Sequence, residues 1–164
     1  MANYHRQVRV AAPLDEVWAF HSRIEGLTEL TPEWMNMRVE GVRGPDGDPD
    51  PEVLEAGSQA RLSVRPLGIG PRQRWTSKIV YRDEDEESAV FRDTMEDGPF
   101  REWVHTHRFV AAGGDTIVHD DVEYRLPLDG LGDLASPFAV VGFEPMFRYR
   151  HRKTKEHFEG GGRG

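Results

Sequence analysis

The sequence predicts an α+β fold in which an antiparallel β-meander is followed by a long C-terminal α-helix. From Ser58 onward, apolar residues recur at every second position in five successive runs, as in half-buried strands. The connections between the runs are short and rich in Gly, Pro and Asp, which is typical of hairpin turns. After Pro127 the apolar spacing becomes that of a helix.

A strand and a short helix are predicted at the start of the chain. Residues 3–11 alternate imperfectly and indicate a strand that ends before Pro13. Pro13 suits the first turn of a helix, and the acidic residues of that turn complement the helix dipole. Val17, Trp18 and Phe20 give this helix an apolar side.

Three further segments precede the meander. Residues 24–30 predict a second short helix, which Thr31-Pro32 ends, and residues 35–42 predict a strand. Residues 43–57 are rich in Gly, Pro and acidic residues and indicate a surface loop. A loop of this length is either a solvated insertion or a flap over the mouth of a cavity.

Alternation assigns one face of each strand in the meander. The residues of this inward face are Ala60, Leu62 and Val64, then Trp75, Ser77, Ile79 and Tyr81, then Ala89, Phe91, Asp93 and Met95, then Trp103, His105, His107 and Phe109, and finally Thr116, Val118, Asp120, Val122, Tyr124 and Leu126.

The C-terminal helix is predicted to start at an N-cap at Ser136, with Pro137 in its first turn. Pro145 would kink or restart the helix because proline lacks the N–H donor. Residues 160–164 are expected to form a flexible Gly-rich tail. The apolar face of the helix consists of Leu134, Phe138, Val141 and Met146.

Composition bounds the class of protein. A length of 164 residues fits one domain. The 29 acidic and 21 basic residues give a net charge of -8, which argues against nucleic acid or an anionic membrane as the main partner. The acidic, lysine-poor composition resembles that of proteins adapted to high salt. Without cysteine, the chain has no disulfide, thiolate nucleophile or Cys-based metal site.

No signal region or membrane-spanning run is visible, so we expect a cytoplasmic protein with no membrane insertion. We expect it to be a monomer or a homodimer.

The strand over residues 102–109 is the most informative part of the sequence. His105 and His107 share one face of this strand. The rings of Trp103 and Phe109 lie on the same face, while charged side chains mark the other face as solvated. Two inward imidazoles between large rings are typical of a small-molecule site with a few placed polar groups.

Several motifs together match a known family. They are Pro13-x-x-x-Val17-Trp18-x-Phe20, Leu30-Thr31-Pro32, the run from Phe91 through Asp93, Met95, Gly98-Pro99-Phe100, Trp103, His105 and His107 to Phe109, Asp120-x-Val122-x-Tyr124-x-Leu126-Pro127, and Phe147-x-Tyr149-Arg150-His151. With these motifs the chain resembles the SRPBCC (START-like, polyketide cyclase and lipid-transport) superfamily over nearly its whole length.

This resemblance implies a helix-grip fold, in which a curved antiparallel sheet of about seven strands wraps around the long C-terminal helix. Two short helices lie between the first and second strands. Residues 1–159 would form a single START-like ligand-binding domain. Members of the superfamily bind lipids, sterols, polyketides, quinones or plant hormones between sheet and helix, and some catalyse cyclisation or dehydration. We therefore expect a cavity of a few hundred cubic ångströms there.

The inward face supplies the candidate site residues. Burying polar groups costs about 1–3 kcal/mol each unless they find partners. The inward polar residues therefore form either a buried network that only fixes the sheet or a cluster that orients a ligand. Arg150 would pair with a ligand carboxylate or with Asp120, or lie on the surface. His5, His21, His119 and His157 are expected at the surface. The predicted ligand-binding residues are Trp75, Phe91, Asp93, Met95, Trp103, His105, His107, Phe109, Asp120, Tyr124, Phe138, Val141 and Arg150.

Three functions compete for this cluster. The first is non-catalytic binding of a small hydrophobic molecule such as a lipid, polyketide, quinone or isoprenoid, without a cofactor. The alternative is a cyclase or dehydratase-like enzyme that uses acid–base chemistry. Its candidate catalytic residues are Asp93, His105, His107, Asp120 and Tyr124. The third is a metal site built on His-x-His and a carboxylate, which the sequence supports weakly, and no metal is predicted.

Overall fold

The computed structural model describes residues 1–127 and 132–160, with side chains from Gly142 onward in the last helix. Within these residues, no helix is long and apolar enough to cross a membrane. The elements are β1 (Ala2–Val10), α1 (Leu14–His21), α2 (Ile24–Glu29), the 3-10 turn η1 (Glu33–Met35), β2 (Arg38–Arg43), β3 (Gln59–Val64), the 3-10 turn η2 (Pro66–Gly68), β4 (Gln73–Glu84), β5 (Ser88–Glu96), β6 (Glu102–Ala112), β7 (Asp115–Arg125) and α3 (Gly132–Glu159).

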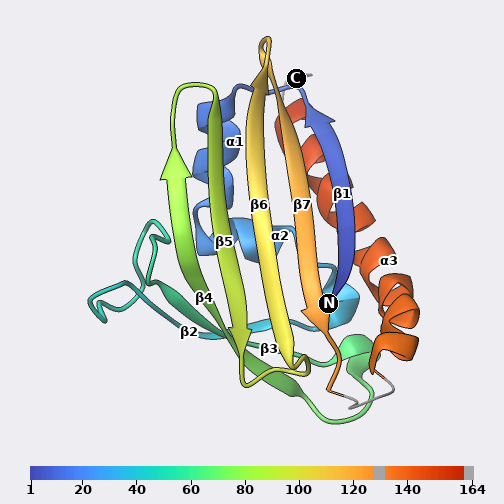
Figure 1. Cartoon of the computed structure of the whole chain (residues 1–164). Helices are drawn as coiled ribbons and strands as arrows, with labels where there is room; N and C mark the ends of the chain where they lie inside the picture. The colour runs from blue at the N-terminus through green and yellow to red at the C-terminus, as the bar shows by residue number, and fades with distance from the viewer. Residues whose placement is uncertain (128–131, 161–164) are drawn as a thin grey trace.

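The sheet has seven strands in the order β1-β7-β6-β5-β4-β3-β2, and neighbouring strands are antiparallel. Consecutive strands from β2 to β7 are neighbours, and β1 closes the sheet against β7. The helices lie against one face of the curved sheet (Figure 1). The predicted α+β helix-grip fold is confirmed.

Helix α3 covers the β1 and β7 side of the sheet. Its buried side chains Phe143, Phe147, His151 and Thr154 recur at helical spacing, so they form one stripe. Phe143 and Phe147 pack on Tyr124, with ring centroids of Phe143 and Tyr124 at 5.0 Å. This contact anchors the middle of the helix to the sheet.

A second aromatic cluster lies under α1. Trp18 meets Phe109 at 5.4 Å and Phe91 at 5.9 Å between ring centroids. A third, smaller cluster joins Ala60 and Leu62 to α2. The space that the three clusters leave between them is where the candidate site lies.

A β-bulge in β4 overturns one expectation from alternation. The register between β4 and β5 shifts between Ile79 and Tyr81, so residues beyond the shift change faces. Tyr81, predicted to point inward, is 45% exposed. Arg82 points inward instead, and its guanidinium lies 4.2 Å from the centre of the Trp18 ring.

Two predicted boundaries were also wrong. The strand expected from residue 35 begins at Arg38, because residues 33–35 form η1, which ends at Asn36 in the left-handed region with φ 47°. Helix α3 begins at Gly132, upstream of the predicted N-cap Ser136, and continues through Pro145. A proline lacks one N–H, and the remaining helical bonds sustain the helix around it. Most of the predicted tail, residues 161–164, lies outside the described residues.

Candidate functional site

A cavity of about 170 Å³ lies between the sheet, α2 and α3. Its position agrees with the expected place between sheet and C-terminal helix, but it is smaller than expected. Apolar side chains make most of the wall, including Leu27 from α2, Leu62 from β3 and Phe147 from α3. Polar side chains from β5, β6 and α3 make one end of it. The predicted ligand-binding residues that line it are Trp75, Phe91, Asp93, Met95, Trp103, His105, His107 and Arg150.

Three other predicted residues do not line the cavity. Phe109 faces inward but is fully buried against Trp18 and His21 beneath α1. Tyr124 is covered by Phe143 of α3. Asp120 lies behind the histidines and is 1% exposed. Alternation places a side chain on a face, but whether it meets a cavity or another element depends on what packs there. The predicted residues Phe138 and Val141 lie outside the residues whose side chains are described.

The polar end of the cavity is a network across three strands. In the sheet register, Asp93 on β5 is opposite His105 on β6, and Asp120 on β7 is opposite His107. The hydrogen bonds run diagonally, from His105 Nε2 to Asp120 Oδ1 at 2.7 Å and from His107 Nε2 to Asp93 Oδ2 at 2.9 Å. Because a carboxylate can only accept, both Nε2 atoms carry a proton.

His107 is held from two sides. Its Nδ1 lies 3.2 Å from Asp120 Oδ1, an ion-pair distance outside hydrogen-bond geometry. Its ring stacks on Phe91 with centroids 4.0 Å apart, and the His105 ring lies 3.6 Å away on the other side. His107 therefore has little freedom to turn.

His151 of α3 completes the network, and the sequence reasoning missed it as a site residue. Its Nε2 donates to Asp120 Oδ2 at 2.6 Å, across the gap between helix and sheet. A helical count from Phe143 and Phe147 reaches His151 four residues later, so the buried stripe of α3 was the signal that could have found it.

Charge partners decide the protonation of this network. Burial alone would raise the pKa of Asp120, but contacts with three histidines hold that pKa well below its usual range. Burial likewise opposes the charged form of Asp93, yet the neighbouring imidazoles lower its pKa. Both carboxyl groups are therefore ionised at neutral pH.

The pKa values of the two strand histidines shift in opposite directions. Burial would lower the pKa of His107, but the carboxylates of Asp93 and Asp120 outweigh it and raise the pKa. For His105, burial and then the positive charge of His107 lower the pKa, and Asp120 offsets this only in part. The arrangement favours the neutral form of His105 and the protonated form of His107, side by side at the cavity.

The same group contains a possible ligand set for a metal ion. Asp93, His105 and His107 each have a donor atom within 4.8 Å of the others, and no other such group occurs among the described residues. The Nε2 atoms of both histidines already bond to carboxylates. A metal bound through the Nδ1 atoms would leave those bonds in place, and the absence of a metal stays a prediction.

Two further segments at the cavity were predicted differently. His21, expected at the surface, is buried at the C-terminal end of α1 and lines the cavity, because α1 turns this side toward Phe109. In the loop over residues 43–57, Leu54 lines the cavity and its N–H donates to the Ser22 carbonyl at 2.8 Å. A lid role for this loop stays a prediction.

Solved structures with the same fold share little sequence with this chain. A protein from Thermus thermophilus is 17% identical over 98% of this chain and 99% of its own, with a TM-score of 0.69. A norcoclaurine synthase point mutant from Thalictrum flavum, in complex with a transition-state analogue, is 18% identical over 95% of both chains, with a TM-score of 0.63. A START superfamily protein from Mycobacterium smegmatis is 15% identical over 96% of this chain and 97% of its own, with a TM-score of 0.60.

These likenesses show the fold alone. No curated protein matches the chain. The family model described as polyketide cyclase / dehydrase and lipid transport matches residues 10–148, in agreement with the SRPBCC resemblance of the motifs. The chain therefore belongs to the polyketide cyclase / dehydrase and lipid transport family.

Proposed function

We propose that the chain binds a small molecule with an apolar body of one or two rings and a single polar group, seated in the cavity between sheet and α3. The observation that carries this proposal is a mostly apolar cavity whose lining includes a group of polar side chains from β5, β6 and α3. Small-molecule sites are built in this way, with apolar walls and a few polar groups that fix orientation.

The cavity volume favours a compact ligand. At about 170 Å³ it is smaller than the roughly 300–1,000 Å³ of sites for drug-sized molecules. A long-chain lipid would require the walls to move apart. Among the ligand classes of the family, ring compounds of polyketide type suit this volume best.

The polar end would orient such a ligand. Asp93 can accept a hydrogen bond, and the Arg150 guanidinium can donate one, since both line the cavity. A ligand hydroxyl or carbonyl placed there would find a partner without leaving its apolar body exposed.

Calorimetric titration with 2-naphthol and naphthalene tests the proposal. The two probes share an apolar body, and only 2-naphthol has a polar group. We expect 2-naphthol to bind about tenfold more tightly, as for one added hydrogen bond. Equal affinity for the two probes, or no binding of either, would contradict the proposal.

A matched pair of variants tests whether 2-naphthol binds in the cavity. Ala60→Phe adds a ring inside the cavity wall, whereas Val80→Phe adds the same ring on the exposed face of β4. We expect the first to abolish 2-naphthol binding and the second to leave it unchanged. Circular dichroism of both variants checks that the fold is kept. Native mass spectrometry of the freshly purified protein would show any ligand that it retains.

The pair of histidines also favours a second function, acid–base catalysis of cyclisation or dehydration. His105 is oriented by Asp120 and His107 by Asp93, so a neutral base and a protonated acid lie side by side at the cavity. A carbonyl compound with an acidic C–H bond would lose that proton to the base.

Deuterium exchange of 2-tetralone in D₂O, followed by NMR, separates this enzyme from a carrier. An enzyme should speed exchange at the carbon between the ring and the carbonyl, and His105→Asn should reduce that rate on the order of 10²–10⁴-fold while 2-naphthol still binds. A carrier should give the same exchange rate as buffer in both proteins.

A further inference from the structure

Positive charge gathers in particular segments of this acidic chain, and one of them lies in the middle of the sequence. Residues 58–82 contain no Asp or Glu, although the whole chain has a net charge of -8. The basic residues of this segment are Arg61, Arg65, Arg72, Arg74, Lys78 and Arg82. The net charge of the chain therefore does not show that β3, η2 and most of β4 form a basic segment.

The fold brings another arginine into this region. Arg38 on β2 lies opposite Ser63 of β3, and Arg74 lies opposite the same serine from β4. Burial and then the charges of Arg38, Arg65 and Arg74 lower the pKa of Arg72, so these side chains repel one another. Glu40, 3.5 Å from Arg74, is the nearby acidic partner. We call Arg38, Arg61, Arg65, Arg72 and Arg74 the arginine cluster.

An exposed apolar tip adjoins the arginine cluster. In the connection between β3 and β4, Leu67 is 69% exposed and Ile69 is 75% exposed. Leu67 has φ 55°, a left-handed conformation that is unusual for leucine. Trp34 of η1, 40% exposed, adds an aromatic ring. These three side chains are the apolar tip.

Hydrogen bonds hold the two parts of the tip together. The Arg65 N–H donates to the Met35 carbonyl at 2.9 Å, and Asn36 Nδ2 donates to the Arg65 carbonyl at 3.0 Å. Arg72 Nη1 donates to the Asn36 carbonyl at 2.8 Å. The turns η1 and η2 therefore form one platform that presents apolar side chains beside arginines.

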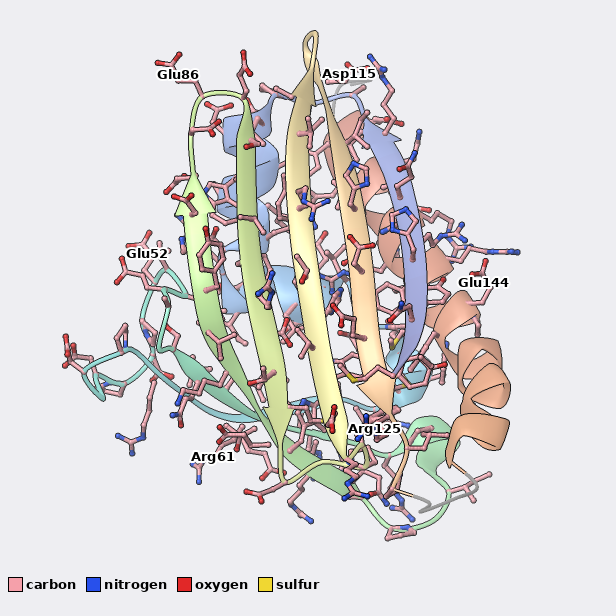
Figure 2. The ribbon with its side chains drawn as sticks, viewed as in Figure 1. Glu52, Arg61, Glu86, Asp115, Arg125 and Glu144 are labelled. Carbon is pink, nitrogen blue, oxygen red and sulfur yellow. The ribbon has the colours of Figure 1, made fainter. Side chains whose placement is uncertain are left out.

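The opposite end of the sheet is acidic. Figure 2 shows Glu86 and Asp115 at one end of the strands and Arg61 and Arg125 at the other. Residues 83–87, at the end of β4 and in its connection to β5, are five consecutive acidic residues. Glu86 in this acidic run and Arg61 therefore lie at opposite ends of the strands.

We propose that the apolar tip and the arginine cluster dock on the surface of an anionic lipid bilayer. The arginines pair with lipid phosphates, and Leu67, Ile69 and Trp34 enter the interface between headgroups and acyl chains. Exposed leucine and isoleucine have no use in phosphate-backbone binding, which favours a bilayer over a nucleic acid. Met35 lines the cavity and neighbours Trp34 in the chain, so docking brings the cavity wall to the lipid surface.

Vesicle flotation tests this proposal independently of ligand binding. We expect the protein to float with phosphatidylcholine vesicles that contain about one third phosphatidylglycerol, and not with pure phosphatidylcholine. High salt should weaken the binding because it screens the arginine contribution. Failure to bind anionic vesicles, or equal binding to both kinds, would overturn the proposal.

Two variants and two controls locate the surface. Leu67→Ser with Ile69→Ser, and separately Arg61→Gln with Arg74→Gln, should each lower the vesicle partition coefficient at least about tenfold. Tyr81→Ser on the exposed face of β4 and Arg9→Gln on β1 remove matched groups elsewhere and should leave it unchanged. Unchanged partition in both double variants would also refute the docking surface.

Binding of 2-naphthol in the cavity serves as the folding control for these variants. All of them should still bind 2-naphthol like the unmodified chain, because none of the substituted residues lines the cavity. A vesicle defect with normal 2-naphthol binding assigns the effect to the docking surface alone. If the unmodified chain does not bind 2-naphthol, the proposed ligand is contradicted, and the vesicle result stays valid.

Discussion

Two regions beside the cavity each contain a histidine buried to nearly the same degree, and they shift its pKa in opposite directions. His21, under α1, is 7% exposed, and His107, in the network on β6, is 4% exposed. The pKa of His21 is lowered to about 3, whereas that of His107 is raised. Burial is nearly equal, so the partners make the difference.

The partners of the two rings explain the contrast. Burial first, and then the positive charge of Arg150, disfavour the imidazolium form of His21. Its Nδ1 donates to the Val17 carbonyl at 2.8 Å, and its buried Nε2 has no partner among the described residues. His107 instead lies between two ionised carboxylates, which offset the loss of hydration. The neighbours of a buried histidine thus decide whether its pKa falls or rises.

The largest expected effect at pH 7 comes from removing the charge that holds the network together. Asp120→Asn leaves the buried histidines without their shared carboxylate, so the free energy of unfolding should fall by about 3–5 kcal/mol. Urea denaturation at pH 7 measures it. Asp121→Asn, on the other face of the same strand, is the control and should change it by no more than about 0.5 kcal/mol. Similar losses in both variants would show that the network adds nothing specific.

A smaller loss is expected from the helix side of the network. His151→Leu keeps an apolar side chain in the stripe of α3 but removes the donor to Asp120 Oδ2. A hydrogen bond to a charged group contributes about 1.5–3 kcal/mol, and the unfolding free energy should fall by that amount. Thermal denaturation measures it. A variant as stable as the parent would mean that α3 is held by its phenylalanines alone.

The His21 region predicts loss of stability in acid. Unfolded histidine has a pKa near 6.5 and folded His21 one of about 3, so between these values the unfolded chain binds more protons. His21 therefore makes the unfolding free energy fall by about 1.4 kcal/mol per pH unit as pH drops from roughly 6.5 to 3. Urea denaturation over this range, with His21→Leu as comparison, measures the slope. Identical slopes in both proteins would contradict the assignment.

The His107 region predicts the opposite pH dependence. Its folded pKa lies above the unfolded value of 6.5, so its contribution is present below pH 6.5 and is lost as pH rises through the folded value. This effect is the smallest of the four because neutral His107 can keep its bond to Asp93. NMR titration of the imidazole Cε1–H signals should give a midpoint above 6.5 for His107 and no titration of His21 above about pH 5. Midpoints near 6.5 for both rings would remove the contrast.

Local patterns explain how much of the site was predictable. Alternation on β5 and β6 predicted that Asp93, His105 and His107 share the inward face, because side-chain direction in a strand depends only on position along it. The same logic failed at Tyr81, where the bulge arises from pairing between β4 and β5. It also treated Phe109 and Tyr124 as cavity residues, although α1 and α3 cover them.

The amino-acid sequence by itself determined the α+β class, the strand order of the meander and the family, since each rests on periodicity, turn residues and local motifs. Only the tertiary structure decided that His151, 31 positions from Asp120, would bond to it, and that His21 would be buried with no carboxylate bonded to it among the described residues. It also gathered arginines from three strands beside the apolar tip. Protonation and surface charge depend on distances between residues far apart in the chain, and those distances exist only once the sheet and its helices have packed.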